Sequence, residues 1–256
     1  KAESGTEAWE FTQAGDRIVA GPAIAGNLIL IASANGTLFA LNQSGSQVWK
    51  FPAKGPLWAA PAVSGDHIYL GSLSHTIYAL DLQGNQVWSR DLGGAIASTP
   101  LTAKDLVIVG TFGNGLYALD QATGQVRWSV ATKGWVWGSA TAEGDVLYFG
   151  DVGGTMYAVR VAEGQVAWSL TPDGPVAAAP VVSGDQVYFV TESGSAYARK
   201  ATDGTPGWEV PVGGQLLADP SIADGLLLIA PSGSQALLTA LDLTSGAIRW
   251  TFTPAK

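Results

Sequence analysis

The stretch Ala118–Trp128, ALDQATGQVRW, decides the fold because altered copies of it recur along the chain. The other copies are ALNQSGSQVW (40–49), ALDLQGNQVW (79–88), AVRVAEGQVAW (158–168), ARKATDGTPGW (198–208) and ALDLTSGAIRW (240–250). Together with one earlier tryptophan, the residues that end these copies recur every 39 to 42 positions: Trp9, Trp49, Trp88, Trp128, Trp168, Trp208 and Trp250. A period of roughly 20 to 50 residues is typical of solenoids, propellers and similar arrays.

Each repeat reads as a set of four short strands. Between Pro61 and Trp88, the apolar runs HIYLG (67–71) and TIYALD (76–81) are separated by a short turn, and a Gly-Asp pair precedes them. Such pairs between apolar runs are hairpin signals, because tight hairpin turns need positive φ. A linear β-solenoid usually has shorter coils with parallel strands, whereas four hairpin-linked strands in about 40 residues match a propeller blade. We therefore predict an all-β fold, a β-propeller of six four-stranded antiparallel blades.

The repeats fill the chain almost without insertion. We predict a single propeller domain over residues 1–256, with repeats at approximately 10–49, 50–88, 89–128, 129–168, 169–208 and 209–250. Residues 5–13 contain a further tryptophan and are predicted as an extra strand, which we favour as the strand that closes the ring. Two alternatives stay open: one tryptophan strand is left on an outer edge that a partner extends, or the chain is a portion of a longer protein.

Charge and composition exclude several classes of function. The net charge is −8 and no cluster of lysine and arginine exists, which argues against a nucleic-acid partner and against docking to anionic lipid. No apolar run reaches the roughly 18 residues of a membrane span. The chain contains no cysteine and only two histidines, which excludes disulfides and argues against a transition-metal site. No signal-peptide hydrophobic region begins the sequence, so we expect any export signal to have been removed or left out.

The motif A-x-D-x-x-T-G-x-x-x-W, intact from Ala118 to Trp128, resembles the tryptophan-docking motif of quinoprotein-type (PQQ-like) propeller repeats. The Asp120 and Thr123 side chains are suited to hydrogen-bond the amides of the turn. Gly124 supplies a left-handed residue, and the tryptophan ring is expected to lie between adjacent blades with its N–H bonded to an acceptor. We assign this structural role to all seven spaced tryptophans and predict loosened turns where Arg160 and Lys200 replace the aspartate.

The same resemblance raises the question of catalysis. Enzymes of this superfamily hold a quinone and Ca²⁺ on the propeller axis and typically have eight blades. Here the acidic residues expected to face the axis, Asp151, Glu192 and Asp219, lie on different repeats and form no set of calcium ligands. A hydrolytic triad would have to recruit His67 or His75, which we interpret instead as a surface strand residue and a polar loop residue. No carboxylate pair has a spacing suited to acid–base work. We predict no catalytic residue, no metal and no cofactor, and therefore no enzyme.

Function in a repeat protein tends to lie where one repeat breaks the pattern. Alignment of the first strands on their prolines shows three additional tryptophans, Trp58, Trp135 and Trp137. The turns between second and third strands should open on the same side and add Leu73, His75, Phe112, Asp151 and Glu192. We predict that these residues line the mouth of the central channel. They either plug a narrow ring or form a recognition pocket, since exposed aromatic groups with polar neighbours are typical of binding sites.

Within the superfamily, the short, acidic, insertion-poor repeats are similar to those of the cofactor-free, BamB-like propellers. That resemblance implies a non-catalytic scaffold of the bacterial cell envelope, located in the periplasm or on the cell surface and lipid-anchored when full-length. Its partners would be proteins bound through loops or an edge strand. The alternatives are an extracellular sensor domain for a small molecule or glycan, since tryptophan stacks well on a sugar, and a PQQ-dependent dehydrogenase.

Overall fold

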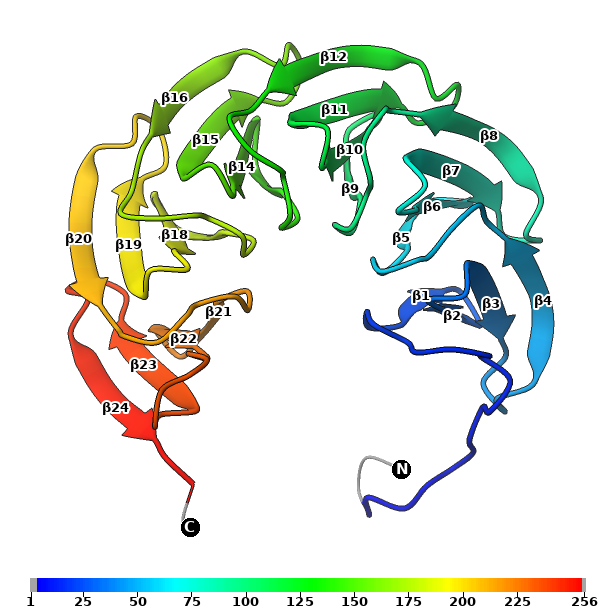
Figure 1. The fold of residues 1–256 in the computed structure, drawn as a ribbon, viewed down its shortest axis with the longest axis horizontal. Helices are drawn as coiled ribbons and strands as arrows, with labels where there is room; N and C mark the ends of the chain where they lie inside the picture. The colour runs from blue at the N-terminus through cyan, green and yellow to red at the C-terminus, as the bar shows by residue number, and fades with distance from the viewer. Residues whose placement is uncertain (1–3, 255–256) are drawn as a thin grey trace. The chain divides into compact units, whose positions relative to one another are not determined.

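The protein, a computed structural model that describes residues 4–254, consists of short strands joined by turns. Its 24 strands form six four-stranded sheets, and in each sheet the strands lie side by side in chain order (Figure 1). The predicted fold class is confirmed: the chain is an all-β propeller with six antiparallel blades. The first three and last two residues of the predicted domain 1–256 lie outside the described residues.

The chain divides into two compact units, and the boundary runs through the third sheet. One unit extends to Gly113 and includes Ala118–Arg127, and the other consists of Asn114–Tyr117 and the chain from Trp128 onward. The single domain over residues 1–256 therefore stays a prediction.

The first three sheets contain twelve strands in chain order. The first sheet consists of β1 (Ala23–Ala25), β2 (Leu28–Ala32), β3 (Thr37–Leu41) and β4 (Gln47–Pro52). The second consists of β5 (Ala62–Ser64), β6 (His67–Gly71), β7 (Thr76–Asp81) and β8 (Gln86–Asp91). The third consists of β9 (Leu101–Ala103), β10 (Leu106–Thr111), β11 (Gly115–Asp120) and β12 (Val126–Ala131).

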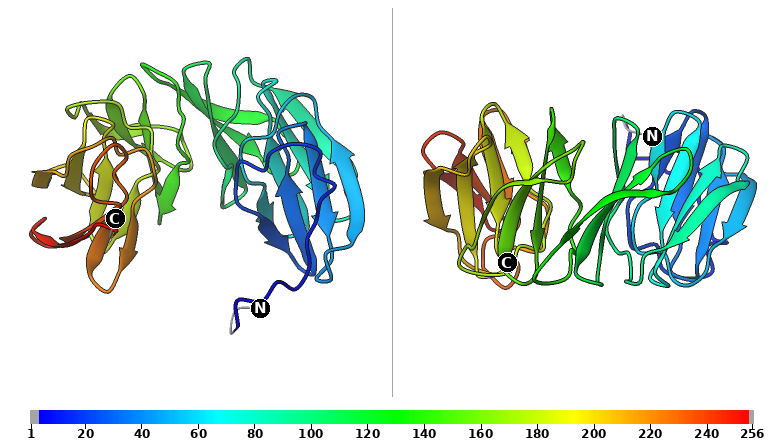
Figure 2. Two further views of the ribbon diagram at one scale, coloured as in Figure 1. Left: turned by 60° about the horizontal axis from the view of Figure 1, so that its bottom comes forward. Right: turned by 90° about the horizontal axis from the view of Figure 1, so that it is seen from above.

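The remaining three sheets repeat this plan. The fourth sheet consists of β13 (Thr141–Glu143), β14 (Val146–Asp151), β15 (Thr155–Arg160) and β16 (Val166–Leu170). The fifth consists of β17 (Val181–Ser183), β18 (Gln186–Val190), β19 (Ser195–Lys200) and β20 (Pro206–Pro211). The sixth consists of β21 (Ser221–Ala223), β22 (Leu226–Ile229), β23 (Leu238–Asp242) and β24 (Ile248–Phe252). Figure 2 shows the strands of each sheet from two further directions.

Burial follows the order of strands within a sheet. The second and third strands are almost entirely buried, as in β10 and β15, because apolar side chains from both of their faces pack against neighbouring residues. The fourth strands are mostly exposed, and in β8 only Trp88 is buried, with 9% of its surface accessible. This alternation is expected of a strand with one buried face, in which successive side chains point in opposite directions.

Six of the seven spaced tryptophans dock on the sheet that follows them in the chain. Each indole Nε1–H donates to a backbone carbonyl 33 to 35 residues further on, at 2.8 to 3.0 Å. The donor and acceptor pairs are Trp9 and Gln43, Trp49 and Leu82, Trp88 and Gln121, Trp128 and Val161, Trp168 and Ala201, and Trp208 and Leu243. Each docked indole N–H thus has the acceptor that it requires.

Each docked ring covers a glycine of the receiving turn: Gly45, Gly84, Gly124, Gly164, Gly204 or Gly246. These glycines have φ between 66° and 84°, in the left-handed region. A Cβ at any of them would lie 2.5 to 3.0 Å from the tryptophan Cδ2. The glycine of the motif is therefore required twice, by the turn and by the ring above it.

The other motif residues shape the turn and its strand pair. Asp120 accepts the amides of Ala122 and Thr123, the Thr123 hydroxyl and the Arg127 guanidinium, and the Arg127 and Thr123 hydrogen bonds lower the pKa of Asp120 to about 2. Where Arg160 and Lys200 replace this aspartate, the turn keeps its backbone bonds of 2.8 and 2.9 Å. In the turn after Lys200, the Asp203 carboxylate also accepts the Thr205 amide at 2.9 Å. The predicted loosening of these two turns therefore has no counterpart in their hydrogen bonds.

Residues 5–13, predicted as an extra strand, are irregular in the structure. This segment forms no ladder with any strand among the described residues, yet its side chains dock as those of a fourth strand do. Trp9 covers Gly45, and Phe11 lies edge-on against Phe39 with ring centroids 5.3 Å apart. The docked rings hold the segment without backbone pairing. That it closes the ring stays a prediction.

The docking contacts predict unequal costs for two tryptophan truncations. Trp88→Ala should lower the free energy of unfolding by about 3–5 kcal/mol, because it removes a buried ring and uncovers Gly124. Trp250→Ala is the control, since 42% of the Trp250 surface is exposed, and should cost less than about 1 kcal/mol. Urea unfolding followed by circular dichroism measures both, and equal losses would contradict the structural role assigned to docking.

Candidate functional site

Two of the predicted aromatic residues stand on one exposed segment of the second unit. The segment connects β12 to β13 and contains Trp135, Val136 and Trp137. Val136 is fully buried, whereas Trp135 and Trp137 have 48% and 43% of their surface exposed. The backbone is extended here, so the valine points into the protein and the flanking indoles point outward.

A buried carboxylate anchors the start of this segment. The Asp151 side chain, which is fully buried, accepts the backbone amides of Lys133 and Gly134 at 2.9 and 3.1 Å on one oxygen. The Tyr157 hydroxyl donates to the same oxygen at 3.0 Å, and the Thr155 amide donates to the other at 2.9 Å. Asp151 was predicted to face the channel mouth, and the structure places it beneath the tryptophan segment as an anchor.

Close backbone contacts fix both ends of the segment. Gly134 lies against Gly153, where a Cβ on Gly134 would come within 2.3 Å of the Gly153 amide. Gly138 lies against the backbone of Ala177, with only 2.5 Å between its would-be Cβ and the carbonyl oxygen. The Trp135 carbonyl also accepts the Val152 amide at 3.0 Å. The two indoles are therefore presented on a rigid support, which lowers the entropy cost of binding.

A hollow opens beside this support. Its volume is about 200 Å³, and its walls are the turn 152–154 and the connection 171–175 between the fourth and fifth sheets. Val152 lines the hollow and also pairs with Trp135 through its amide. The arrangement of projecting indoles next to a small recess is suited to the side chains of a protein surface.

The predicted residues of the first unit occupy equivalent places. Trp58 is half-buried between the buried Leu57 and Ala59. Leu73 is half-buried, and its amide donates to Pro56 at 2.9 Å. His75 is exposed with φ of 67°.

Phe112 and Glu192 repeat the bond that Leu73 makes. Both are half-buried, and their amides donate at 2.9 Å to Ala95 and Pro175, respectively. In each repeat, the turn between second and third strands thus meets the residue five positions before the aligned proline. The common channel mouth formed by all eight residues stays a prediction.

Sequence reasoning missed Arg199, although it breaks the repeat pattern clearly. The same position in five other copies is apolar and fully buried: Leu41, Leu80, Leu119, Val159 and Leu241. Arg199 is 8% exposed. Its guanidinium donates to the carbonyls of Ala198 and Trp208 and to Glu209, and it lies 4.9 Å from the Tyr197 ring centroid. A charged residue in an apolar repeat position was the signal.

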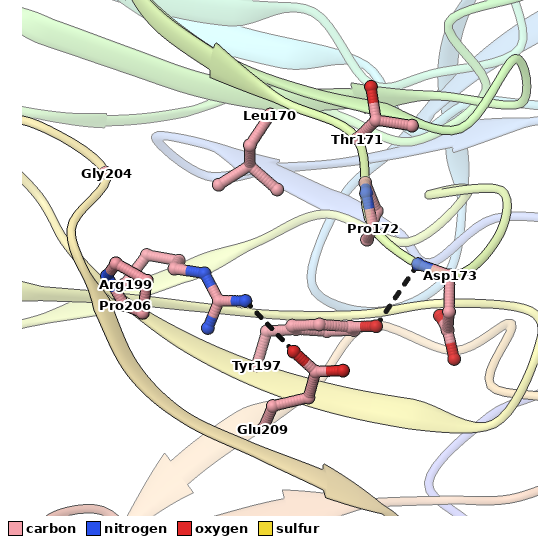
Figure 3. A pocket seen from close by; sticks show the side chains of 9 residues that line it. All are labelled: Leu170, Thr171, Pro172, Asp173, Tyr197, Arg199, Gly204, Pro206 and Glu209. Atoms are coloured by element: carbon pink, nitrogen blue, oxygen red, sulfur yellow. Dashed lines mark hydrogen bonds and ion pairs between the residues drawn. The ribbon is translucent and has the colours of Figure 1, made fainter.

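Arg199 and its neighbours line a second cavity of about 280 Å³ in the same unit (Figure 3). Leu170 and Pro172 face the stacked Tyr197 and Arg199 side chains across it. Burial raises the pKa of Tyr197 to about 12. Partial burial works to raise the pKa of Asp173, but hydroxyl donors from Ser195 and Thr191 lower that pKa on balance. The cavity is therefore lined by one guanidinium group, of Arg199, and two carboxyl groups, of Asp173 and Glu209.

Among the described residues, no helix combines the length and apolarity needed to cross a bilayer. Within residues 4–254, no three histidine, aspartate or glutamate side chains form a group that could hold a metal ion.

Comparison with known families identifies one family across the chain. The family model described as "Outer membrane protein assembly factor BamB" matches residues 1–134, 60–175 and 171–255. Comparison with curated proteins finds no match.

Solved structures with the same fold include proteins of different kinds. BamB from Moraxella catarrhalis is 18% identical with a TM-score of 0.81, over 93% of this chain and 77% of that chain. The computationally designed Ika8 protein is 13% identical with a TM-score of 0.69, over 93% and 87% of the two chains. A europium-containing methanol dehydrogenase is 15% identical with a TM-score of 0.83, over 96% and 73%. At these identities, the similarities show the fold.

Replacement of Arg199 should distinguish a packing role from an ionic one. Arg199→Leu restores the apolar residue of the other repeats and should change the free energy of unfolding by less than about 1 kcal/mol. Arg199→Ala leaves a void and should cost about 2–4 kcal/mol. Urea unfolding measures both variants, and a large loss for the leucine variant would show that the guanidinium bonds themselves hold the sheet.

Asp173 should make stability depend on pH in the acid range. Its pKa in the folded protein lies below the value of about 3.9 in the unfolded chain. Its contribution is therefore complete above the unfolded pKa and is lost as pH falls through the folded pKa. Asp173→Asn should flatten the dependence of stability on pH below about pH 4. Urea midpoints measured from pH 7 to pH 2 test this, and an unchanged slope would refute it.

Proposed function

The chain belongs to the BamB family, and we propose that it is a non-catalytic, protein-binding propeller of the bacterial cell envelope. The family description names assembly of outer membrane proteins, which supports a role in interaction rather than in chemistry. The proposed location is extracytoplasmic, in the periplasm or on the cell surface. The proposed partners are proteins that bind through loops or an edge strand.

The observation that carries this proposal is the exposed pair Trp135 and Trp137 on a fixed backbone. Tryptophan is enriched at the centres of protein interfaces, because one rigid ring buries a large area at little entropy cost. Nearly half of the surface of each indole is exposed, and a fixed pair of exposed aromatic side chains favours a partner. Asp151 takes part as a positioning residue, since its carboxylate holds the amides that begin the segment.

Two alternatives to the protein-binding role remain: a ligand-binding domain and an oxidoreductase. The exposed indoles also suit stacking on a sugar, which supports a sensor or ligand-binding domain for a glycan or small molecule. The quinone-dependent oxidoreductase implied by the motif resemblance is the second alternative, and a methanol dehydrogenase is among the structures that share this fold. The eight predicted mouth residues contain two carboxylates, and one of them, Asp151, already accepts four hydrogen bonds. We therefore favour the binding role over the enzyme.

Photocrosslinking separates a binding segment from a structural plug. A photoreactive residue at position 137 should crosslink to proteins of the cell envelope, and the same residue at Val87, an exposed control on β8, should not. Trp135→Ala should remove the crosslinks while changing the free energy of unfolding by less than about 1 kcal/mol. Asp151→Thr, which introduces the residue found at Thr111 and Thr191, should weaken them. Loss of stability with Trp135→Ala would instead identify a plug.

Ligand additions address the alternatives. PQQ with Ca²⁺ should leave the melting temperature unchanged, and a rise would favour the oxidoreductase. A panel of envelope oligosaccharides should leave tryptophan fluorescence unchanged, and a saturable change that Trp137→Ala removes would favour the glycan sensor.

A further inference from the structure

The last spaced tryptophan differs from the other six. Trp250 on β24 is 42% exposed, and among the described residues its indole N–H has no acceptor. Phe252 lies on the same face of the strand as Trp250, since their partners Leu238 and Ala240 alternate by two on β23, and it is 53% exposed. Leu237, whose amide donates to Phe252, is 54% exposed. We call Leu237, Trp250 and Phe252 the β24 patch.

Two other places in the chain show what a Trp-x-Phe sequence binds. Trp9 and Phe11 dock on the first sheet, where Phe11 meets Phe39 edge-on at 5.3 Å. Trp49 and Phe51 dock on the second sheet, where Phe51 meets Tyr78 edge-on at 5.4 Å. In both cases the tryptophan covers a glycine, and the phenylalanine packs on an aromatic ring of the third strand. Trp250 and Phe252 have the same spacing and no such receptor among the described residues.

We call the glycine, carbonyl acceptor and aromatic ring that a Trp-x-Phe pair contacts its receptor. On the first sheet, the segment that occupies the receptor is not a strand. On the second to sixth sheets, the docked tryptophan comes from a hydrogen-bonded fourth strand. On the first sheet, Trp9 and Phe11 come from residues 5–13, which pair with no strand among the described residues. Among the described residues, release of this segment breaks the ring contacts and the indole hydrogen bond of Trp9 but no ladder. Its occupant is therefore the easiest to exchange.

We propose that the β24 patch binds the first sheet of a second copy of this chain. In that contact, Trp250 and Phe252 of one copy take the places of Trp9 and Phe11 on the other, against Gly45 and Phe39. The contact is head-to-tail, because two different surfaces meet. A second copy is the fitting partner since the chain itself carries the required glycine, carbonyl acceptor and aromatic ring at the required positions.

Competition keeps this association weak in the unaltered chain. The tethered Trp9 segment acts at an effective concentration on the order of millimolar. Against this, β24 is already an ordered strand, so its docking costs less conformational entropy than ordering residues 5–13. The net charge of −8 on each copy adds repulsion that salt screens. Removal of the segment's two rings should therefore strengthen association.

Sedimentation velocity at physiological ionic strength tests the proposal. The double variant Trp9→Ala/Phe11→Ala should self-associate at least roughly tenfold more tightly than the unaltered chain. The double variant Trp250→Ala/Phe252→Ala should stay monomeric at every concentration. Val48→Ala, which removes an equally exposed side chain from β4, should leave association unchanged.

A mixing experiment identifies the two surfaces. A quadruple variant with all four aromatic residues changed to alanine has an open receptor and no patch. Mixed with the unaltered chain, it should form a 1:1 complex, and mixed with Trp250→Ala/Phe252→Ala it should form none. Failure of the first mixture to form a complex would overturn the proposal.

Oxidative footprinting and a single-substitution variant complete the test of association. Oxidative footprinting of Trp250 and Phe252 in the Trp9→Ala/Phe11→Ala variant should show protection that grows with concentration. Protection in a purely monomeric sample would mean docking within one chain and would also overturn the proposal. If that double variant lacks a cooperative thermal transition, Phe11→Ala alone replaces it and should give a smaller change in the same direction.

Discussion

A tryptophan ring that covers a left-handed glycine in the next sheet is the contact on which this structure depends. It fixes the spacing of the repeats, because the ring must reach a turn 33 to 35 residues further on. It also explains three letters of the motif at once. The glycine leaves room for the ring, the aspartate holds the turn, and the alanine lies directly opposite the tryptophan in the ladder, as Ala79 does for Trp88. A larger residue in place of the glycine would meet the ring at less than contact distance.

Because the tryptophan–glycine contacts hold the sheets together, the connections between sheets can carry exposed residues. The connection that carries Trp135 and Trp137 contributes only Val136 to the core, while Asp151 and two glycine contacts hold its backbone. The site thus consists of supporting residues, which hold the backbone in place, and of exposed residues, which are available to a partner. This division accounts for the different burial of the predicted mouth residues: the Asp151 carboxylate is buried, whereas Trp135 and Trp137 are exposed.

A residue of the site could be predicted where comparison of the repeats reveals it, and could not be predicted where its role depends on contacts with distant backbone groups. The exposed tryptophans were found because most other repeats have a non-aromatic residue at the same position, such as Ala95 or Ala177. The role of Asp151 was not found, because its donors are backbone amides 17 and 18 residues earlier, and backbone donors leave no trace in a sequence. Arg199 was overlooked although the same position in the other repeats is apolar, because the prediction considered polar residues in turns and Arg199 lies within a strand. The irregular segment 5–13 was mistaken for a strand because its tryptophan and phenylalanine match those of true fourth strands.

The sequence by itself determined the six sheets and the contact that spaces them. A ring, a glycine and a turn recur at a fixed interval, and local chemistry requires all three wherever the interval is kept. Only the tertiary structure decided which tryptophans are covered. Trp9 and Trp250 stand in nearly the same sequence context, yet one ring lies on Gly45 and the other is exposed. A tryptophan ring is buried only where another sheet lies against it in the tertiary structure, and the sequence of a single repeat does not specify that sheet.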